Sequence, residues 1–297
     1  MTGVCTLCPR SCSARRGTET AGGFCRSPLL PSVARAAAHF GEEPCLAGKN
    51  GAGAVFFTGC NLGCVYCQNR AISRGEGGRI LTVSELRDCF LRLQDEGVDC
   101  LDLVTGAQYL PAIAEALQSA ALTIPVVWNS SGYESVEALR QLEGLVQIYL
   151  PDYKYSDPQA AKRYSLAEDY PAAAREAILE MYRQVGPCVF GAEGRLTRGV
   201  LIRHLLLPGR GEDARDAIDF AADSFPPGSV LFSLMSQYTP IEGLEAWPEL
   251  TRRVTAEENA EIIHYMQVRR LSGYWQETEA ATEELLPAFD GTGVKER

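Results

Sequence analysis

The chain has 297 residues, 46% of them hydrophobic, and a formal net charge of −10. This length suits one α/β barrel or two smaller domains, and the acidic balance disfavours a protein that grips the nucleic-acid backbone. No apolar run approaches the ~18–20 residues of a membrane span, and the N-terminus has no apolar segment of signal-peptide type. We therefore expect a cytoplasmic protein that binds neither membrane nor nucleic acid.

Residues 1–50 are predicted to form a cysteine-rich leader. Cys5, Cys8, Cys12 and Cys25 follow the spacing C-x2-C-x3-C-x12-C. Few large apolar residues precede Leu29, so a metal would compensate for the missing core. Four thiolates could close a zinc site or hold an iron–sulfur cluster, and the spacing does not decide between them. Surface thiols in an unstructured tail are the alternative.

A second cysteine group follows an apolar run at residues 53–58 that predicts a buried strand bounded by glycines. Cys60, Cys64 and Cys67 then follow the spacing C-x3-C-x2-C in one exposed turn. Thiolates are preferred ligands of iron–sulfur clusters and zinc. A set of three leaves one coordination position open, which indicates chemistry rather than a structural site. Incidental thiols are the alternative.

Strands and helices alternate from about residue 51 to residue 250. Strands are predicted at 53–58, 98–104, 124–128, 146–150, 199–207 and 229–234. Helices are predicted at 84–96, 110–121, 134–142, 157–165, 171–184 and 212–223. A capping box at Thr82 and Glu85 marks the first helix. This alternation indicates a parallel sheet with right-handed crossovers. Six units are fewer than the eight of a closed barrel, so we expect an incomplete (β/α)6 TIM-like barrel.

The remaining residues, 251–297, are predicted to begin with an amphipathic helix at 256–270. Irregular sequence follows at 273–277 and 289–291. Its aromatic residues suggest that this tail packs back onto the barrel as a lid or edge cover.

The segment Thr58–Asn69, with its TGCNLGCVYCQN sequence, resembles the signature of radical S-adenosylmethionine (SAM) enzymes. Within that superfamily the chain is most similar to uncharacterised relatives of the pyruvate formate-lyase activating enzyme. The resemblance implies a [4Fe-4S] cluster on Cys60, Cys64 and Cys67, whose open iron is chelated by SAM. It also implies a low-potential electron donor of flavodoxin or ferredoxin type. Reduction then cleaves SAM to methionine and a 5′-deoxyadenosyl radical, which abstracts hydrogen from a substrate that the sequence does not identify.

Reacting groups in parallel α/β barrels gather where strands end. After the second strand, related enzymes often carry Gly-Gly-Glu, which holds the methionine amino group. This chain has Thr105 and Gly106 and lacks the acid, so this contact is in doubt, although both residues could still serve. After the third strand, Asn129 and Ser131 lie in a polar turn suited to the ribose or to methionine. The alternative is a strand-to-helix turn with Ser131 near the helix cap.

The fourth strand leads into Asp152 and Lys154, which share one face if the strand extends that far. Charged groups that enter a barrel mouth need partners, because burial is costly for them. By resemblance to the activating enzymes, both residues would contact SAM, the lysine through the carboxylate. A solvated loop pair is the alternative.

On the fifth strand, alternation prevents Arg203 and His204 from both pointing inward. The resemblance favours Arg203 as a second anchor for the methionine carboxylate, with His204 as a core residue that faces the helices. After the sixth strand, Gln237 occupies a place where related activating enzymes carry a polar residue near SAM.

Several functions are compatible with these features. A radical SAM enzyme could install a glycyl radical on a partner enzyme, or it could modify a peptide or a small metabolite. The chain lacks the ferredoxin-like cluster insert of many glycyl-radical activating enzymes, which weakens the first version. A non-catalytic zinc or iron–sulfur protein is a second class, although closed structural sites use four ligands rather than three. A DNA-repair or tRNA-modifying enzyme is disfavoured by the acidic charge.

Overall fold

A computed structural model of the chain describes residues 5–276 and 287–294. The described strands are β1 (Ser32–His39), β2 (Ala52–Phe57), β3 (Arg79–Ile80), β4 (Cys100–Val104), β5 (Val126–Ser130), β6 (Ile148–Pro151), β7 (Val189–Phe190), β8 (Leu196–Leu205), β9 (Leu231–Met235) and β10 (Gly273–Trp275). The α-helices are α1 (Arg70–Ser73), α2 (Val83–Asp95), α3 (Leu110–Ser119), α4 (Val136–Leu139), α5 (Pro158–Ser165), α6 (Tyr170–Val185), α7 (Gly211–Ser224) and α8 (Ala256–Val268). Short 3-10 helices are η1 (Ala107–Tyr109), η2 (Arg140–Leu142), η3 (Ala192–Gly194) and η4 (Pro248–Leu250).

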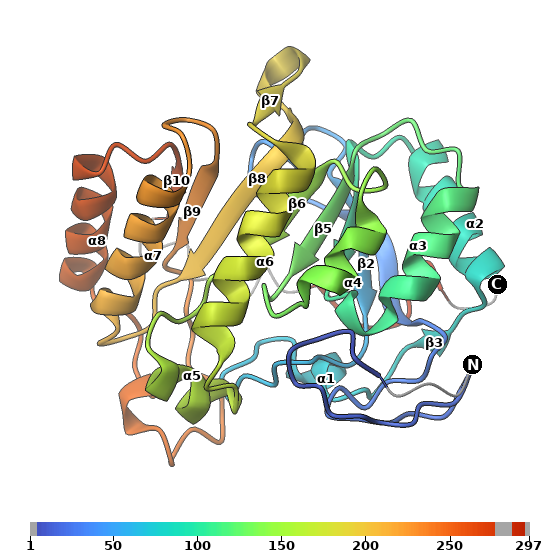
Figure 1. Cartoon of the computed structure of the whole chain (residues 1–297), viewed down its shortest axis with the longest axis horizontal. Coiled ribbons are helices and arrows are strands. Elements are labelled where there is room, and N and C mark those ends of the chain that lie inside the picture. The colour runs from blue at the N-terminus through green and yellow to red at the C-terminus, as the bar shows by residue number, and fades with distance from the viewer. Residues whose placement is uncertain (1–4, 277–286, 295–297) are drawn as a thin grey trace.

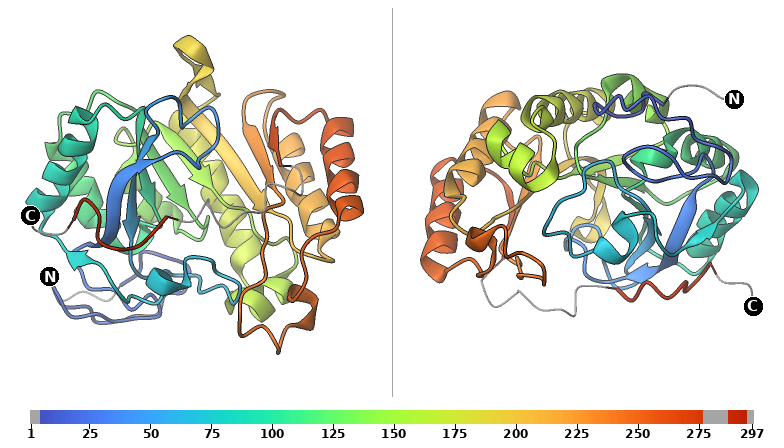
Figure 2. Two further views of the ribbon diagram at one scale, coloured as in Figure 1. Left: turned by 180° about the vertical axis from the view of Figure 1, so that it is seen from behind. Right: turned by 90° about the horizontal axis from the view of Figure 1, so that it is seen from below.

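Among the described residues these strands form one sheet in the order β10-β9-β8-β6-β5-β4-β2-β1-β3, with β7 beside β8. From β10 to β2 in this order, each strand is parallel to the next one. Helices cover the outer face, with α2 near one end of the sheet and α8 near the other (Figure 1). The sheet therefore curls into a partial barrel that does not close (Figure 2). This confirms the expected six-unit α/β fold, whose strands are β2, β4, β5, β6, β8 and β9.

Three local elements differ from the sequence-based expectation. β1 lies inside the predicted leader and pairs antiparallel with β2. Its alanine-rich sequence lacks the large apolar residues that mark a strand. β10, in a segment predicted to be irregular, extends the sheet beside β9. The helix predicted at 134–142 is shortened to α4 and η2, and Ser135 caps it by accepting from the Ala138 amide. Ser131 is therefore not the cap.

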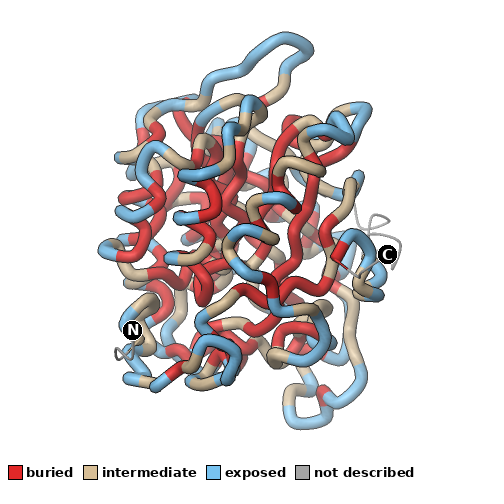
Figure 3. Tube along the Cα trace, turned by 90° about the vertical axis from the view of Figure 1, so that its right-hand side faces the viewer, coloured by how far each residue is buried: buried red, intermediate tan, exposed pale blue. Residues whose placement is uncertain are grey.

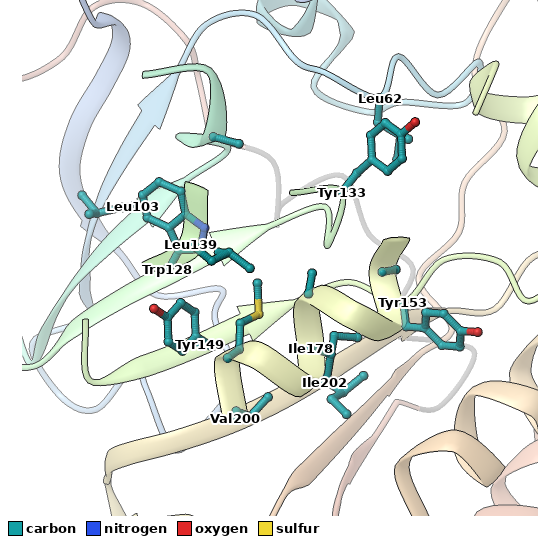
Figure 4. Close-up of a cluster of buried hydrophobic side chains, with 14 of the residues drawn as sticks. Leu62, Leu103, Trp128, Tyr133, Leu139, Tyr149, Tyr153, Ile178, Val200 and Ile202 are labelled. Carbon is teal, nitrogen blue, oxygen red and sulfur yellow. The ribbon is translucent and has the colours of Figure 1, made fainter. Parts of the chain in front are cut away.

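Strand alternation divides the core into an outer and an inner part. The large outer part lies between the sheet and the helices, where Ile178 of α6 packs near Val200 and Ile202 of β8 (Figure 4). The inner part fills the barrel near the beginning of the strands. Its buried members are Cys45, Leu46, Ala52, Cys100, Val127, Ile148, Leu150, Leu196, Leu201 and Leu231. Burial is continuous along β2, β4, β5 and β6, and exposed segments lie mostly at the periphery of the molecule (Figure 3).

The end of the described chain covers a sheet edge. The amide of Gly291 donates to the carbonyl of Ala34 over 3.1 Å, and the amide of Ala36 donates to the carbonyl of Thr292 over 2.9 Å. Residues 287–294 thus lie along the part of β1 that β3 leaves unpaired. The structure describes the chain up to Gln276 and again from residue 287. Glu277, the last residue of the predicted irregular segment 273–277, therefore lies outside the described residues. No helix in the described ranges has the length and apolarity required to cross a bilayer.

Candidate active site

A cavity of about 430 Å³ lies at the carboxyl ends of the parallel strands. Its wall combines thiols with ionised and amide side chains. The predicted site residues on it are Cys64, Cys67, Asn129, Asp152, Lys154, Arg203 and Gln237. Cys60 lies in the same loop as Cys64 and Cys67. The topology therefore gathers most of the predicted site residues, from distant parts of the sequence, around one space.

The cysteine loop leaves β2 through backbone turns that require glycine. Gly59 has φ +78° and Gly63 has φ +74°, values that side-chain-bearing residues rarely adopt. The sulfur of Cys60 accepts from the Leu62 amide at 3.4 Å, and the sulfur of Cys64 accepts from the Ser165 hydroxyl at 3.1 Å. These hydrogen bonds suit sulfur that carries negative charge.

The three thiols of the loop are free and interact with one another. Burial and the neighbouring Cys64 raise the pKa of Cys60. Burial raises the pKa of Cys67 to about 12, with further contributions from Cys64 and Cys60. Three partly buried thiolates in one loop would require positive charge beside them, which a metal centre supplies.

The number of thiols in this loop suits an iron–sulfur cluster. Each of the three thiolates of Cys60, Cys64 and Cys67 can bind a different iron, and a four-iron cluster then keeps one iron without a protein ligand.

A charged network faces the loop from β6 and β8. Asp152 and Arg203 lie side by side at a parallel bridge between these strands. One carboxylate oxygen of Asp152 accepts from Nε of Arg203 at 3.0 Å, and the other accepts from Nζ of Lys154 at 2.6 Å. Burial alone would raise the pKa of Asp152, but the two cations outweigh it and lower this pKa. The network therefore stays ionised inside the barrel.

Arg203 is held in a fixed orientation by further partners. Its Nη2 donates to Oδ1 of Asn129 at 2.6 Å, and its Nη1 lies 3.4 Å from Oε2 of Glu42. His204, the next residue, is buried, and its Nδ1 lies 2.7 Å from the carbonyl oxygen of Tyr153. Arg203 lines the cavity and His204 does not, as alternation along the strand predicts.

Three acidic side chains in this region were not found by sequence reasoning. Glu42 and Glu43 line the cavity from the segment between β1 and β2, and Asp102 lies on β4 beside Asn129. Burial raises the pKa of Glu43 to about 7, and burial together with Glu42 raises that of Asp102. Oε2 of Glu43 and Oδ1 of Asp102 have no hydrogen-bond partner among the described residues. An aspartate within the otherwise apolar Cys100–Val104 run is the one signal that could have revealed part of this group.

The remaining predicted residues divide into two groups. Gln237 lines the cavity, and its Oε1 accepts from Nε2 of Gln276 at 3.1 Å. Thr105, Gly106 and Ser131 are not among the lining residues. The hydroxyl of Ser131 instead donates to Oδ1 of Asn61 in the cysteine loop over 3.3 Å.

Gln108, near the position where related enzymes carry an acid, donates hydrogen bonds to the start of the cysteine loop. Its Nε2 lies 3.0 Å from the carbonyl oxygens of both Thr58 and Gly59 and 2.7 Å from that of Thr105. Thr105 itself adopts φ +59°, which is unusual for a residue with a side chain. The departure from the usual sequence therefore changes what this turn contacts.

The four leader cysteines lie outside the main cavity. Cys5, Cys8, Cys12 and Cys25 border a second, smaller cavity, which they share with Asn61 of the cysteine loop. The leader and the loop thus adjoin each other, near α1 and beyond the ends of the strands (Figure 1).

A partial parallel barrel with a cysteine loop after its first parallel strand defines the class of protein. The model of the radical SAM superfamily matches residues 54–221, more than half of the chain, and the protein belongs to this superfamily. Membership implies SAM and a [4Fe-4S] cluster as the groups that this site uses, and a chemistry of SAM cleavage to a radical.

Individual relatives add no established activity. An uncharacterised protein of Methanocaldococcus jannaschii, MJ0674, is 29% identical over 266 residues, which are 86% of this chain and 71% of that protein. SuiB of Streptococcus suis, solved with its precursor peptide SuiA, has a TM-score of 0.49 and 11% identity over 76% of this chain. The match spans about half, 49%, of the SuiB chain. A domain of pyruvate-formate lyase-activating enzyme from Bacteroides vulgatus has a TM-score of 0.35 and 13% identity over 65% of this chain and 91% of that domain. Neither structural likeness carries an argument about substrate.

Proposed function

We propose that the protein is a radical SAM enzyme in which Cys60, Cys64 and Cys67 hold the [4Fe-4S] cluster and the main cavity holds SAM. The observation that supports this most strongly is that Cys64 and Cys67 border the same cavity as Lys154 and Arg203. Three cysteines leave one iron without a protein ligand, and the two cations face the space where an anionic group could bind. When bound, the cluster supplies the electron that cleaves SAM to methionine and a 5′-deoxyadenosyl radical.

The side chains around the cavity would orient SAM. Arg203 and Lys154 are the anchors for the methionine carboxylate, because both are cations fixed by hydrogen bonds to Asp152. Asn129 and Gln237 offer amide groups for the polar atoms of methionine and the ribose. Three further residues stay predicted SAM contacts: Thr105, Gly106 and Ser131. They do not line the cavity, so the turns that carry them would have to move for contact with SAM.

The rest of the reaction is hydrogen abstraction from a substrate. One electron comes from a low-potential flavodoxin- or ferredoxin-type protein. The 5′-deoxyadenosyl radical takes a hydrogen atom from the substrate and becomes 5′-deoxyadenosine. This transfer leaves an unpaired electron on the substrate. The substrate is a peptide or protein, or a small metabolite. The cavity walls orient the reactants and exclude water from the radical.

A SAM cleavage assay tests the proposal. The full-length protein is reconstituted anaerobically with iron and sulfide, reduced with dithionite and incubated with SAM, and 5′-deoxyadenosine is measured by chromatography. We expect release by the natural protein and background release by Cys64→Ala. Cys89→Ala, which removes a buried thiol of α2 instead, is the matched control and should retain release. A colourless zinc-bound protein without SAM cleavage would favour the non-catalytic metalloprotein.

A further inference from the structure

The four leader cysteines come together although the leader has little core of its own. They are spread over residues 5–25 and border one small cavity, whose apolar lining includes only Leu7, Phe24 and Ala107 besides the cysteines. All four thiols are free. The sulfurs therefore face a common space without being joined to one another.

Strained turns hold the leader cysteines in these places. Ser11 and Ser13, on either side of Cys12, have φ +41° and +52°, and Arg26, next to Cys25, has φ +54°. Such conformations are strained and persist where the surrounding structure holds them. Gly23 permits the approach of two thiols, because a Cβ there would lie 3.2 Å from Sγ of Cys12 and 3.9 Å from Sγ of Cys25.

Two arginines tie this segment to the rest of the molecule. The guanidinium of Arg10 donates to the carbonyls of Asn61 and Leu62 in the cysteine loop and to those of Ser165 and Leu166 at the end of α5. It also lies 3.5 Å from the centre of the Phe24 ring.

The second arginine, Arg16, is buried. Its Nε donates to the carbonyl of Ser27 at 2.8 Å, and its Nη2 donates to that of Gln108 at 2.7 Å. Its Nη1 lies 3.7 Å from Sγ of Cys5. The leader thus presents its four thiols from a fixed position, with cationic groups beside them.

We propose that Cys5, Cys8, Cys12 and Cys25 hold a second iron–sulfur cluster behind the cysteine loop. The four cysteines border one cavity and can supply one thiolate to each iron of a four-iron cluster. Arg10 and Arg16 then offset the negative charge of the four thiolates. All four positions have protein ligands, so this cluster does not bind SAM. The proposal does not depend on SAM cleavage at the first site.

Metal analysis of the full-length protein, reconstituted with iron and sulfide, tests this second site. The variant Cys60→Ala/Cys64→Ala/Cys67→Ala removes the first site, and Cys5→Ala/Cys8→Ala removes the second. We expect each variant to keep roughly half of the iron of the natural protein, since each retains one four-iron cluster. The iron of the first variant should give a cluster electron paramagnetic resonance (EPR) signal that SAM does not change.

A folding control keeps this test decisive. Cys12 is exposed, so Cys12→Ala should retain the circular dichroism spectrum and thermal transition of the natural protein. Its iron content should still fall. A first-site variant that contains no iron, or that contains one zinc per chain, would overturn the proposal. A folded Cys12→Ala variant with the iron content and EPR spectrum of the natural protein would also overturn it. Loss of SAM cleavage in the first-site variant tests only the proposed function.

Discussion

The hydroxyl of Ser165, the last residue of α5, donates to the sulfur of Cys64 over 3.1 Å. Tyr155 and Tyr66 extend this contact, with 2.8 Å between the hydroxyls of Ser165 and Tyr155 and 2.7 Å between those of the two tyrosines. Because Ser165 uses its hydrogen for Cys64, Tyr155 must donate to Ser165, and Tyr66 to Tyr155. The chain of hydroxyls therefore points toward the sulfur and favours negative charge there.

Replacing Ser165 with alanine should lower the reduction potential of the first cluster. A hydrogen bond to a ligand sulfur stabilises the more negative, reduced state, so its loss makes reduction harder. A redox titration followed by EPR of the reconstituted protein measures the potential. Tyr66→Phe, which removes only the far end of the hydroxyl chain, should shift the potential less. An unchanged potential in Ser165→Ala would show that this contact does not act on the cluster.

Replacing Gly59 with alanine should destabilise the junction between the leader and the cysteine loop. A Cβ at this position would lie 2.2 Å from Oγ of Ser27 and 2.5 Å from the carbonyl oxygen of Cys25. Gly97 has a similar φ, +83°, but a Cβ there meets nothing within 4 Å. Gly97→Ala should therefore cost only the left-handed backbone penalty of about 1–2 kcal/mol, whereas Gly59→Ala should cost more. Urea denaturation compares the two, and equal losses would contradict the close approach of the leader.

Replacing Arg203 with lysine should weaken SAM binding. Lysine cannot reproduce the planar fork with which Arg203 reaches Asp152, Asn129 and Glu42 at once. Loss of one hydrogen bond between charged groups corresponds to about 1.5 kcal/mol, or roughly a tenfold higher Kd. Anaerobic titration calorimetry with SAM measures this change. Arg198→Lys is the matched control, since Arg198 is exposed on the same strand. If both variants bind SAM like the natural protein, Arg203 is not an anchor.

The buried carboxyl of Glu134 should make the protein less stable as the pH rises. Burial raises the pKa of this group from 4.5 to about 7, so the folded protein retains a proton that the unfolded chain releases. The stabilisation is complete below pH 4.5 and is lost as the pH rises through 7, by up to about 3 kcal/mol.

Glu134→Gln should therefore lose less stability than the natural protein between pH 4.5 and 8. Denaturation in urea at a series of pH values gives the free energy of unfolding. Glu137→Gln changes an exposed carboxyl nearby in the chain and should retain the natural slope. Parallel slopes for the natural protein and Glu134→Gln would refute the assignment.

The fold and the cysteine loop could be predicted because their signals are local. The spacing of Cys60, Cys64 and Cys67 lies within one turn, and each strand and helix of the barrel carries its own periodic pattern. Strand alternation indicated that Arg203 and His204 do not both point inward, and the resemblance to radical SAM enzymes favoured Arg203 on the cavity.

Other features depend on contacts between distant segments. Glu42 reaches Arg203 only because the β1–β2 segment enters the barrel, and nothing near Glu42 in the sequence indicates this. Ala34 and Ala36 of β1 are buried, but alanine is a weak strand former, so the local pattern does not indicate a strand. Gln108 faces the carbonyls of the cysteine loop because the loop folds over its turn.

The EPR spectrum of the reduced first cluster, recorded before and after SAM is added, tests the central claim most directly. The Cys5→Ala/Cys8→Ala variant isolates this cluster from the second one. We predict that SAM changes the signal, because its amino and carboxylate groups complete the shell of the iron that Cys60, Cys64 and Cys67 leave open. A cluster signal that is identical with and without saturating SAM would contradict the account.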